Sequence, residues 1–320
     1  MSRARTLDEM MAALRSFQES RTLLTALELD VFTAVGEGAS SAEAAVRIGA
    51  DARATDMLLN ALVALGTMEK REGIFRCTPE SRALGAARAG LMHTVHLWET
   101  WSTLTVCVKT GTTVRRLGVE GRPEAWTEAF IAAMHARAGA TAAHLVAVVD
   151  ASRVRRMLDV GGGPATFAIA FAEAHPELRA EVLDLGPVVP IGARNVREAG
   201  FSDRITVRVG DLRTDDFGQG YDLILTSAIC HMLDEDENRD LFRRCARALA
   251  PGGRLVVREF ILEPDRTGPP AAAIFALNML VGTRRGNTYT EAEYRQWLRE
   301  AGFSRISRPE PEGELIIAER

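Results

Sequence analysis

The sequence has few of the features that mark secreted or membrane-spanning proteins. Its four cysteines are scattered and form no C-x-x-C pair, which argues against a disulfide framework and against a cysteine-based zinc site. No window reaches the roughly 18 uninterrupted apolar residues of a membrane-spanning helix. The basic residues at the start are not followed by an apolar segment, so we expect neither export nor membrane insertion.

The chain also lacks an excess of either charge. Its net charge of −4 and its pI near 6.0 provide no basic surface for nucleic acid or for an anionic membrane. At 320 residues, 47% of them hydrophobic, it has the composition of a globular protein long enough for two domains. We therefore expect a cytoplasmic protein whose partners include neither nucleic acid nor a membrane.

Short helices dominate the first part of the chain. Residues 10–35 and 41–65 carry apolar side chains three and four positions apart, which is the signature of amphipathic helices. Two strand-like segments, 68–71 and 74–78, are separated by a Glu-Gly turn and predict a small hairpin. Three helices and a hairpin together predict a winged-helix domain over residues 1–90.

The pattern changes along the rest of the chain. Residues 91–150 contain two further helical stretches, which we expect to form a linking layer and the roof of a pocket. From residue 151 to 320, apolar strands alternate with helices, and this alternation predicts a parallel, doubly wound α/β sheet. The last segments, 304–309 and 314–319, predict a hairpin at the edge of that sheet.

A glycine-rich turn follows the first strand of the predicted sheet. It reads Asp159-Val160-Gly161-Gly162-Gly163-Pro164-Ala165 and leads into a helix. Glycines let the backbone pass close to a ligand, and the start of a helix offers free N–H groups. Because such a turn can be purely structural, and because NAD enzymes use the same geometry, it leaves the kind of nucleotide cofactor open.

Three further features narrow this choice. Asp184 ends the second predicted strand, where a carboxylate can accept hydrogen bonds from both ribose hydroxyls. After the third strand, Asp211 can hold an adenine amino group and Leu212 can cover the ring. Pro251-Gly252-Gly253 precedes the fifth strand. The ordered set predicts a nucleotide-type cofactor site.

Together these motifs resemble the class I S-adenosylmethionine-dependent methyltransferases, and Ala165 at the third glycine position of a dinucleotide fingerprint disfavours NAD. The resemblance implies a Rossmann-like, mostly parallel seven-stranded sheet. It implies S-adenosyl-L-methionine as the methyl donor and S-adenosyl-L-homocysteine as the product. The residues that it implies as cofactor contacts are Asp159, Gly161, Gly163, Asp184, Leu185, Asp211, Leu212 and Ser227.

The fourth predicted strand leads to a histidine, His231. Ligands of open α/β sheets lie beyond the carboxyl ends of the strands, so His231 should face the donor side. A lone histidine is more often structural. However, the whole chain resembles the plant-type and bacterial dimeric small-molecule O-methyltransferases, in which this histidine is the general base. The resemblance implies that Glu259 orients and charges it.

The same resemblance points to the walls of the acceptor pocket. Phe130 and Met134, in the run F-I-A-A-M, match a helix whose methionine lines the acceptor cavity of the family. Asn278 and Met279 fall on the helix that forms the opposite wall. The predicted acceptor is a small aromatic or polyketide-like metabolite with a phenolic or enolic hydroxyl.

Aromatic residues are few, 6% of the chain, yet three of the four tryptophans lie in the predicted roof. Trp98, Trp101 and Trp126 either pack a helical layer or, as we expect for Trp101, stack on a flat acceptor. His93 and His96 lie one helical turn apart. No third ligand is in sight, and we therefore expect no metal site.

The sequence also departs from the family pattern around the base. Met232 stands where plant members have aspartate, Ser227 replaces a lysine that contacts the cofactor, and Thr288 replaces a second glutamate that supports the base. The base machinery is thus only partly present. These departures leave open transfer to carbon or nitrogen, and chemistry without methyl transfer.

A winged helix also suggests a regulatory DNA-binding protein. Residues 1–100 contain eleven Lys and Arg against thirteen Asp and Glu, a balance that does not favour phosphate contacts. The family uses this domain to dimerise. We therefore predict a homodimer in which apolar helices such as LLTALELDVF, residues 23–32, are partly buried between subunits.

Overall fold

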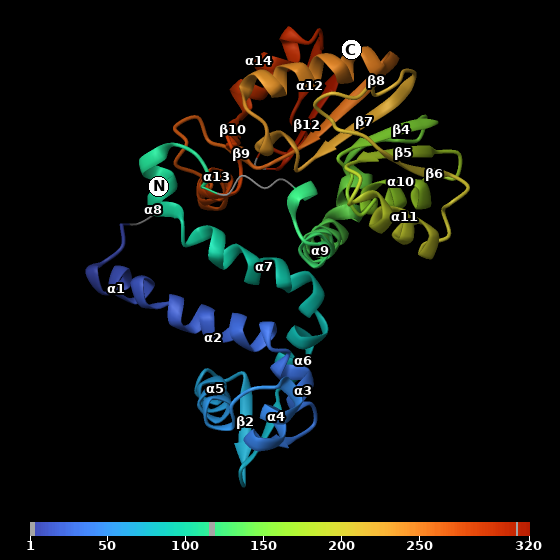
Figure 1. Cartoon of the computed structure of the whole chain (residues 1–320). Helices are drawn as coiled ribbons and strands as arrows, with labels where there is room; N and C mark the ends of the chain where they lie inside the picture. Colours follow the sequence, from blue (N-terminus) through green and yellow to red (C-terminus); the bar gives the residue numbers. More distant parts are fainter. Residues whose placement is uncertain (1–3, 115–118, 312) are drawn as a thin grey trace. The chain divides into compact units, whose positions relative to one another are not determined.

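A computed structural model describes residues 4–114, 119–311 and 313–320 (Figure 1). The chain divides into two compact units, residues up to Trp98 and residues Glu99–Arg320. Each unit has its own hydrophobic core. Among the described residues, no helix is both long and apolar enough to cross a membrane.

The first unit combines helices with a three-stranded antiparallel sheet of order β1-β3-β2. Its elements are α1 (Leu7–Arg15), α2 (Phe17–Glu28), α3 (Val31–Val35), β1 (Ala39–Ser40), α4 (Ser41–Ile48), α5 (Ala52–Ala64), β2 (Met68–Arg71), β3 (Ile74–Cys77), α6 (Pro79–Ala86) and most of α7 (Arg88–Trp101). The predicted winged-helix architecture and its hairpin are confirmed. The strand β1 was not predicted, because two residues carry no periodic signal.

Local signals set the ends of these helices. Ser40 begins α4 with a capping box, in which its side chain accepts from Glu43 N–H and the Glu43 carboxylate accepts from Ser40 N–H. The amphipathic pattern of residues 10–35 falls in three helices, α1, α2 and α3. Its last break lies at Asp30, whose φ of 55° is left-handed and cannot continue an α-helix.

The core of the first unit uses the segment that we expected between subunits. Leu27, Val31 and Phe32 of LLTALELDVF are at most 4% exposed and pack with Leu59 and Phe75. These three side chains are thus already covered within their own unit. Leu23, Leu24 and Leu29 of the same segment stay partly exposed, so its partial burial between subunits remains a prediction.

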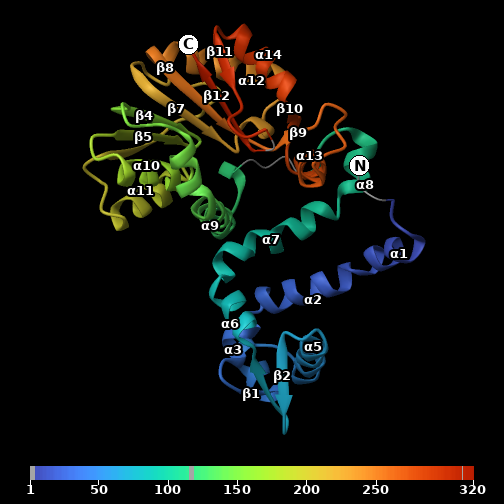
Figure 2. The same ribbon diagram turned by 180° about the vertical axis from the view of Figure 1, so that it is seen from behind.

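The second unit is built on a seven-stranded sheet of order β11-β12-β8-β7-β4-β5-β6 (Figure 2). Its strands are β4 (Arg156–Val160), β5 (Arg179–Asp184), β6 (Ile205–Val209), β7 (Tyr221–Ser227), β8 (Leu249–Arg258), β11 (Arg305–Ser307) and β12 (Leu315–Glu319). The strands β6, β5, β4, β7 and β8 are parallel, whereas β12 is antiparallel to both of its neighbours, β8 and the edge strand β11. The predicted sheet and its closing hairpin are confirmed.

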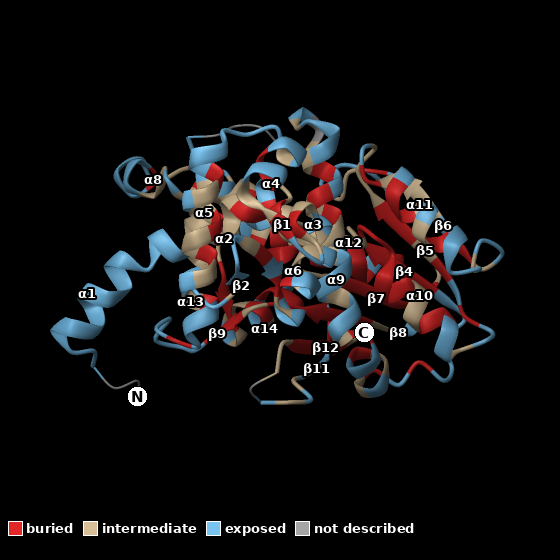
Figure 3. Ribbon diagram, turned by 90° about the horizontal axis from the view of Figure 1, so that it is seen from below, coloured by how far each residue is buried: buried red, intermediate tan, exposed pale blue. Residues whose placement is uncertain are grey.

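Helices cover both faces of this sheet, so that its strands are buried (Figure 3). They are α9 (Glu124–Val148), α10 (Thr166–Ala174) and α11 (Val189–Glu198) on one face, and α12 (Glu235–Ala248) and α14 (Glu291–Glu300) on the other. The remaining elements are α8 (Leu104–Thr110), the 3-10 turns η1 (Val119–Gly121) and η2 (Cys230–Met232), β9 (Ile261–Leu262), α13 (Pro270–Gly282) and β10 (Tyr289–Thr290). The first of the two helical stretches expected within residues 91–150 is divided into α7 and α8.

Candidate active site

The predicted site residues follow the carboxyl ends of five adjacent parallel strands. The glycine loop follows β4, Asp184 ends β5, Asp211 follows β6, His231 follows β7 and Glu259 follows β8. Because parallel strands end at the same edge of a sheet, segments that are far apart in the sequence meet there. One sheet edge therefore carries both the donor candidates and the base candidates.

The glycine loop leaves no room for larger residues. Gly161 and Gly163 have φ values of 67° and 52°, in the left-handed region that favours glycine. A Cβ atom on Gly161 would collide with the Ile229 side chain, and one on Gly162 would lie 2.6 Å from Asp159 Cγ. The loop is thus packed tightly at Gly161 and Gly162, where a larger residue would collide with its neighbours.

Asp184 is tied to this loop by its carboxylate. Its Oδ2 accepts a hydrogen bond from Gly163 N–H and its Oδ1 accepts one from Leu185 N–H, both at 2.7 Å. Burial raises the pKa of Asp184, and these two backbone donors act against the rise. Each oxygen keeps a second lone pair, so the pair can still accept hydrogen bonds from a diol such as ribose.

Asp159 lies beneath the loop, completely enclosed. Neither of its carboxylate oxygens has a hydrogen-bond partner among the described residues. Burial, together with the charge of Asp184, raises the pKa of Asp159 to about 7. Because Asp159 lies against Gly162, its place favours support of the glycine loop over direct contact with a ligand.

Asp211 and Leu212 follow β6, which lies two strands away from β4 in the sheet. Asp211 Oδ1 accepts from Arg213 N–H at 2.8 Å, an Asx turn that leaves Oδ2 for other donors. The Leu212 side chain lies 3.8 Å from the position of a Cβ on Gly161. An apolar side chain therefore lies beside the loop, and a carboxylate directly precedes it in the sequence, which is the combination that a purine ring would require.

His231 and Glu259 form a buried pair. His231 Nδ1 lies 2.7 Å from Glu259 Oε2, and the residues are 6% and 2% exposed. The carboxylate also accepts from the backbone N–H groups of His231 and Phe260, at 3.4 and 3.3 Å. With Nδ1–H donating to the carboxylate, Nε2 is the nitrogen left to accept a proton.

Two phenylalanines that sequence reasoning missed enclose this histidine. Phe275 of α13 meets the His231 ring edge-on at 4.8 Å between centroids, and Phe260 stacks on Phe275 at 4.1 Å. Phe260 directly follows Glu259, and Phe275 precedes Asn278 by nearly one helical turn. Those spacings were the available signals, since both residues neighbour predicted site residues. The imidazole is therefore held from a second side by aromatic contacts.

Thr288 does not contact the histidine. Its hydroxyl donates to the Ala272 carbonyl at 3.1 Å and is fully buried, so it fastens α13. In the part of the chain that the structure describes, Glu259 is the one acidic side chain bonded to the His231 ring. The base therefore has one supporting carboxylate.

The predicted acceptor residues fall into two places. Trp101 Nε1 donates to Asn278 Oδ1 at 2.9 Å, which joins residues 177 positions apart, and Met279 next to Asn278 is buried in α13. Phe130 instead stacks on Trp126 at 5.3 Å. It packs against a small cluster that α9 forms with α11. Met134 lies one turn further along α9 and is half-buried.

An arginine near the base was also missed. Arg137 follows Met134 by nearly one turn of α9, and its guanidinium lies 4.7 Å from the centre of the Phe260 ring. No described carboxylate forms an ion pair with Arg137, whereas Arg258 at the end of β8 pairs with Glu314 at 2.6 Å. One aromatic ring thus separates Arg137 from His231.

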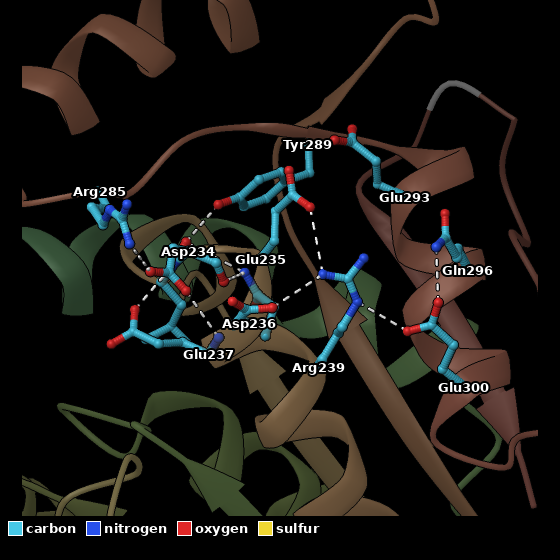
Figure 4. Close-up of polar contacts among 12 residues, drawn as sticks. Asp234, Glu235, Asp236, Glu237, Arg239, Arg285, Tyr289, Glu293, Gln296 and Glu300 are labelled. Atoms are coloured by element: carbon cyan, nitrogen blue, oxygen red, sulfur yellow. Dashed lines mark hydrogen bonds and ion pairs between the residues drawn. The ribbon is translucent and has the colours of Figure 1, made fainter. Parts of the chain in front are cut away.

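The turn that carries His231 is held by a polar cluster (Figure 4). Asp234 caps α12 with Glu237, and the Tyr289 hydroxyl donates to the Leu233 carbonyl at 2.6 Å. Arg239 of α12 pairs with Glu300 of α14 at 3.0 Å. The Tyr289 bond and the Asp234 cap hold the chain directly after η2, and the Arg239 pair joins α12 to α14.

The described residues form no cluster of side chains that could bind a metal ion. In the described ranges, no three His, Cys, Asp or Glu side chains gather as metal ligands would. Burial and the neighbouring His96 lower the pKa of His93 to about 4, so this histidine is neutral at neutral pH. The organic donor that the motifs indicate needs no metal to supply its methyl group.

Comparison with known proteins agrees with this geometry. A family model described as an O-methyltransferase domain matches residues 109–304, and one described as an O-methyltransferase dimerisation domain matches residues 11–86. A 3-hydroxy-5-methyl-1-naphthoate 3-O-methyltransferase of Streptomyces sahachiroi is 35% identical, over 90% of this chain and 87% of that protein. The tetracenomycin polyketide synthesis 8-O-methyl transferase TcmO of Streptomyces glaucescens is 30% identical, over 91% and 89%.

A solved structure extends the likeness to three dimensions. PigF with SAH has a TM-score of 0.88 and is 28% identical, with 99% of this chain and 100% of that chain covered. The Serratia protein of that name is described as S-adenosyl-L-methionine-dependent. The predicted enzyme class and architecture are confirmed. The chain therefore belongs to the O-methyltransferase family.

Proposed function

We propose that this enzyme transfers a methyl group from S-adenosyl-L-methionine to a phenolic or enolic hydroxyl of a small aromatic or polyketide-like metabolite, with His231 as general base. The buried pair of His231 and Glu259, at the same sheet edge as the glycine loop, carries the proposal. The two matched relatives described above act, by their names, on a naphthoate hydroxyl and in polyketide synthesis.

The described residues fit the donor. Asp184 would take the ribose hydroxyls, Asp211 and Leu212 the adenine, and the glycine loop would pass close to the amino-acid part. Asp184 is only partly exposed, so water competes less for its oxygens than at the surface, which strengthens such hydrogen bonds. When bound, the donor supplies an activated methyl group on a sulfonium. These residues orient it, and Leu185 and Ser227 are further contacts that we propose.

His231 has the chemistry of a base. Nε2 accepts the hydroxyl proton of the acceptor, and Glu259 stabilises the imidazolium that results. General-base assistance is worth about 10²–10⁴-fold, whereas alignment of two reactants contributes about 7–11 kcal/mol. One supporting carboxylate is thus compatible with methylation of a phenol, whose pKa is about 10.

We propose that residues from two places in the second unit contact the acceptor. Trp101 and Asn278, which are bonded to each other, present a ring and an amide beside Met279. Phe130 and Met134 approach from α9. A flat, hydroxylated aromatic molecule suits such a mixture of rings, thioethers and a few polar groups.

A transfer assay tests the proposed function. The purified protein is mixed with donor carrying a labelled methyl group and with a panel of naphthols, hydroxynaphthoates and simple phenols. We expect label on the oxygen of at least one member. Donor binding without transfer to any acceptor would favour the alternative of chemistry without methyl transfer, and label on carbon or nitrogen would favour the other alternative. Thr288, which leaves the base with one carboxylate, is the observation that keeps both alternatives open.

We further propose that Arg137 binds the carboxylate of the donor. Acidic side chains line the sheet edge, the donor adds a further carboxylate, and Arg258 is already paired. The His135 ring, two residues before Arg137, is 2.7 Å from the hydroxyl of Thr166 at the start of α10. Arg137 therefore lies on the turn of α9 that connects the glycine loop with the base.

Arg137→Gln is expected to weaken binding of S-adenosyl-L-homocysteine about 10- to 100-fold, because a charged hydrogen-bonding pair is lost. Binding of 5′-methylthioadenosine, which lacks the amino-acid part, should not change. Calorimetry measures both. Asp184→Asn is the comparison, since it should weaken both ligands through the ribose that they share. Equal effects of Arg137→Gln on the two ligands would remove the assignment.

We also propose that the protein is a homodimer, on the strength of the matched dimerisation domain. Light scattering at micromolar concentration measures the mass directly. A monomer would contradict this proposal.

A further inference from the structure

The segment that follows α13 lies against the turn that carries the base. Asn287 N–H donates to the carbonyl oxygen of His231 at 3.0 Å. Two residues further on, the Tyr289 hydroxyl donates to the Leu233 carbonyl at 2.6 Å. The segment thus bonds to the backbone on both sides of Met232. We call residues 283–289 the base clamp.

Gly286 is what allows the base clamp to come so close. A Cβ atom on Gly286 would lie 2.4 Å from the carbonyl oxygen of His231 and 2.6 Å from Thr283 Oγ1. Its φ lies outside the left-handed region, so an alanine could adopt this backbone and only the space is lacking. Because the nearer of the two atoms belongs to the backbone of the base, a larger residue must separate the base clamp from His231.

The base clamp is also anchored to α13. Gly286 N–H donates to Thr283 Oγ1 at 2.8 Å, and the same hydroxyl donates to the Met279 carbonyl at 2.7 Å. Phe275 of this helix meets the His231 ring edge-on. The helix that carries proposed acceptor contacts therefore holds the base in two ways, through its ring and through its backbone carbonyl.

We infer that Gly286 is a positioning residue for the general base. An ordinary contact of a Cβ atom is at least 3.4 Å, so a methyl group at residue 286 requires the base clamp or the His231 backbone to move by about 1 Å. General-base catalysis requires heavy atoms about 2.6–3.2 Å apart, and a displacement of about 1 Å can cost about 100-fold in rate. This inference rests on the proposed role of His231 as general base.

The test adds one methyl group. Gly286→Ala should lower kcat with a simple phenol about 10- to 100-fold at neutral pH, because Nε2 no longer meets the acceptor hydroxyl correctly. Calorimetry should give an unchanged dissociation constant for S-adenosyl-L-homocysteine. The matched control is Gly282→Ala at the end of α13, where a Cβ atom meets nothing within 4 Å. Its kcat should equal that of the wild type.

The dependence on pH separates a misplaced base from a distorted site. A nitro-substituted acceptor of the class that the transfer assay identifies ionises in solution above its own pKa, and its methylation then needs alignment alone. With it, the deficit of Gly286→Ala should shrink as the pH passes that pKa. With a phenol of pKa about 10 the deficit should persist at neutral pH. An equal deficit for both acceptors at every pH would overturn the inference.

A double variant locates the steric conflict. Thr283→Ala/Gly286→Ala removes the hydroxyl that the new methyl group would meet and leaves the His231 carbonyl in place. It should be as slow as Gly286→Ala, with Thr283→Ala as its own reference. Recovery of the Thr283→Ala rate would place the conflict at Thr283 and overturn the inference.

His231→Ala shows which proposal fails if the results differ from these. A wild-type rate in His231→Ala would remove the proposed base itself. A slow His231→Ala with an unchanged Gly286→Ala would leave the base intact and overturn the role of Gly286.

Tyr289→Phe provides a second test of the base clamp, and thermal melting shows whether each variant folds. The variant keeps the ring and loses only the hydroxyl bonded to Leu233, so the same acceptor-dependent deficit should appear at about 2- to 10-fold. If Gly286→Ala does not fold, this variant decides. A wild-type profile with both acceptors would then overturn the inference.

Discussion

His231→Ala is expected to lower the rate of methyl transfer about 10²–10⁴-fold, while donor binding stays within a few-fold of wild type. His231 Nδ1 bonds to Glu259, which leaves Nε2 to take the proton, and Phe260 and Phe275 contact the ring. Steady-state rates with the best acceptor of the panel, and calorimetry with S-adenosyl-L-homocysteine, measure the two quantities. An unchanged rate would remove His231 from the mechanism.

A second histidine variant tests whether the loss of rate is specific to His231. His144 also pairs with a glutamate, Glu310, at 3.0 Å, but its side chain is 58% exposed. His144→Ala should therefore leave the rate unchanged. Glu259→Gln keeps the shape of the supporting side chain and removes its charge, so it should lower the rate without altering donor affinity. Equal rates for Glu259→Gln and wild type would show that the carboxylate does not support the base.

The fold followed from the sequence where a pattern repeats. Alternating strands and helices after residue 151 fixed a parallel sheet, and the ends of its strands brought the glycine loop, Asp184 and His231 to one edge. Element boundaries were less predictable. The helical spacing of apolar residues continues across Asp30 and across the break between α7 and α8, although the helices end there. Tertiary packing outweighs local propensity at these two places.

The sequence predicted which residues belong to the site but not the contacts that packing creates between distant segments. His231 and Glu259 stood out because each follows a strand, and their bond was expected from the family resemblance. Trp101 and Asn278 could not be paired from sequence, since their contact depends on how α7 and α13 fold back on each other. Arg137, Phe260 and Phe275 could not be assigned to the site from sequence either, because their places near the base depend on how α9 and α13 pack.

Asp159→Asn is expected to stabilise the ligand-free protein at pH 8. The pKa of Asp159 is raised from 3.8 to about 7, mainly by burial, so the native state holds a proton that the unfolded state has lost. A raised carboxyl pKa means that stability falls as the pH rises from about 4 to 7. At about 1.4 kcal/mol for each pH unit, the charged form costs about 4 kcal/mol above pH 7.

The difference between variant and wild type is what isolates this effect. At pH 4 both side chains are neutral and similar in shape, so the free energies of unfolding should nearly agree, and the variant should gain about 4 kcal/mol by pH 8. Urea unfolding at several pH values measures it, with Asp203→Asn reporting the loss of an exposed carboxylate. A difference that stays flat between pH 4 and 8 would mean that the carboxylate beneath the glycine loop remains ionised, and hence that it has a partner which stabilises its charge.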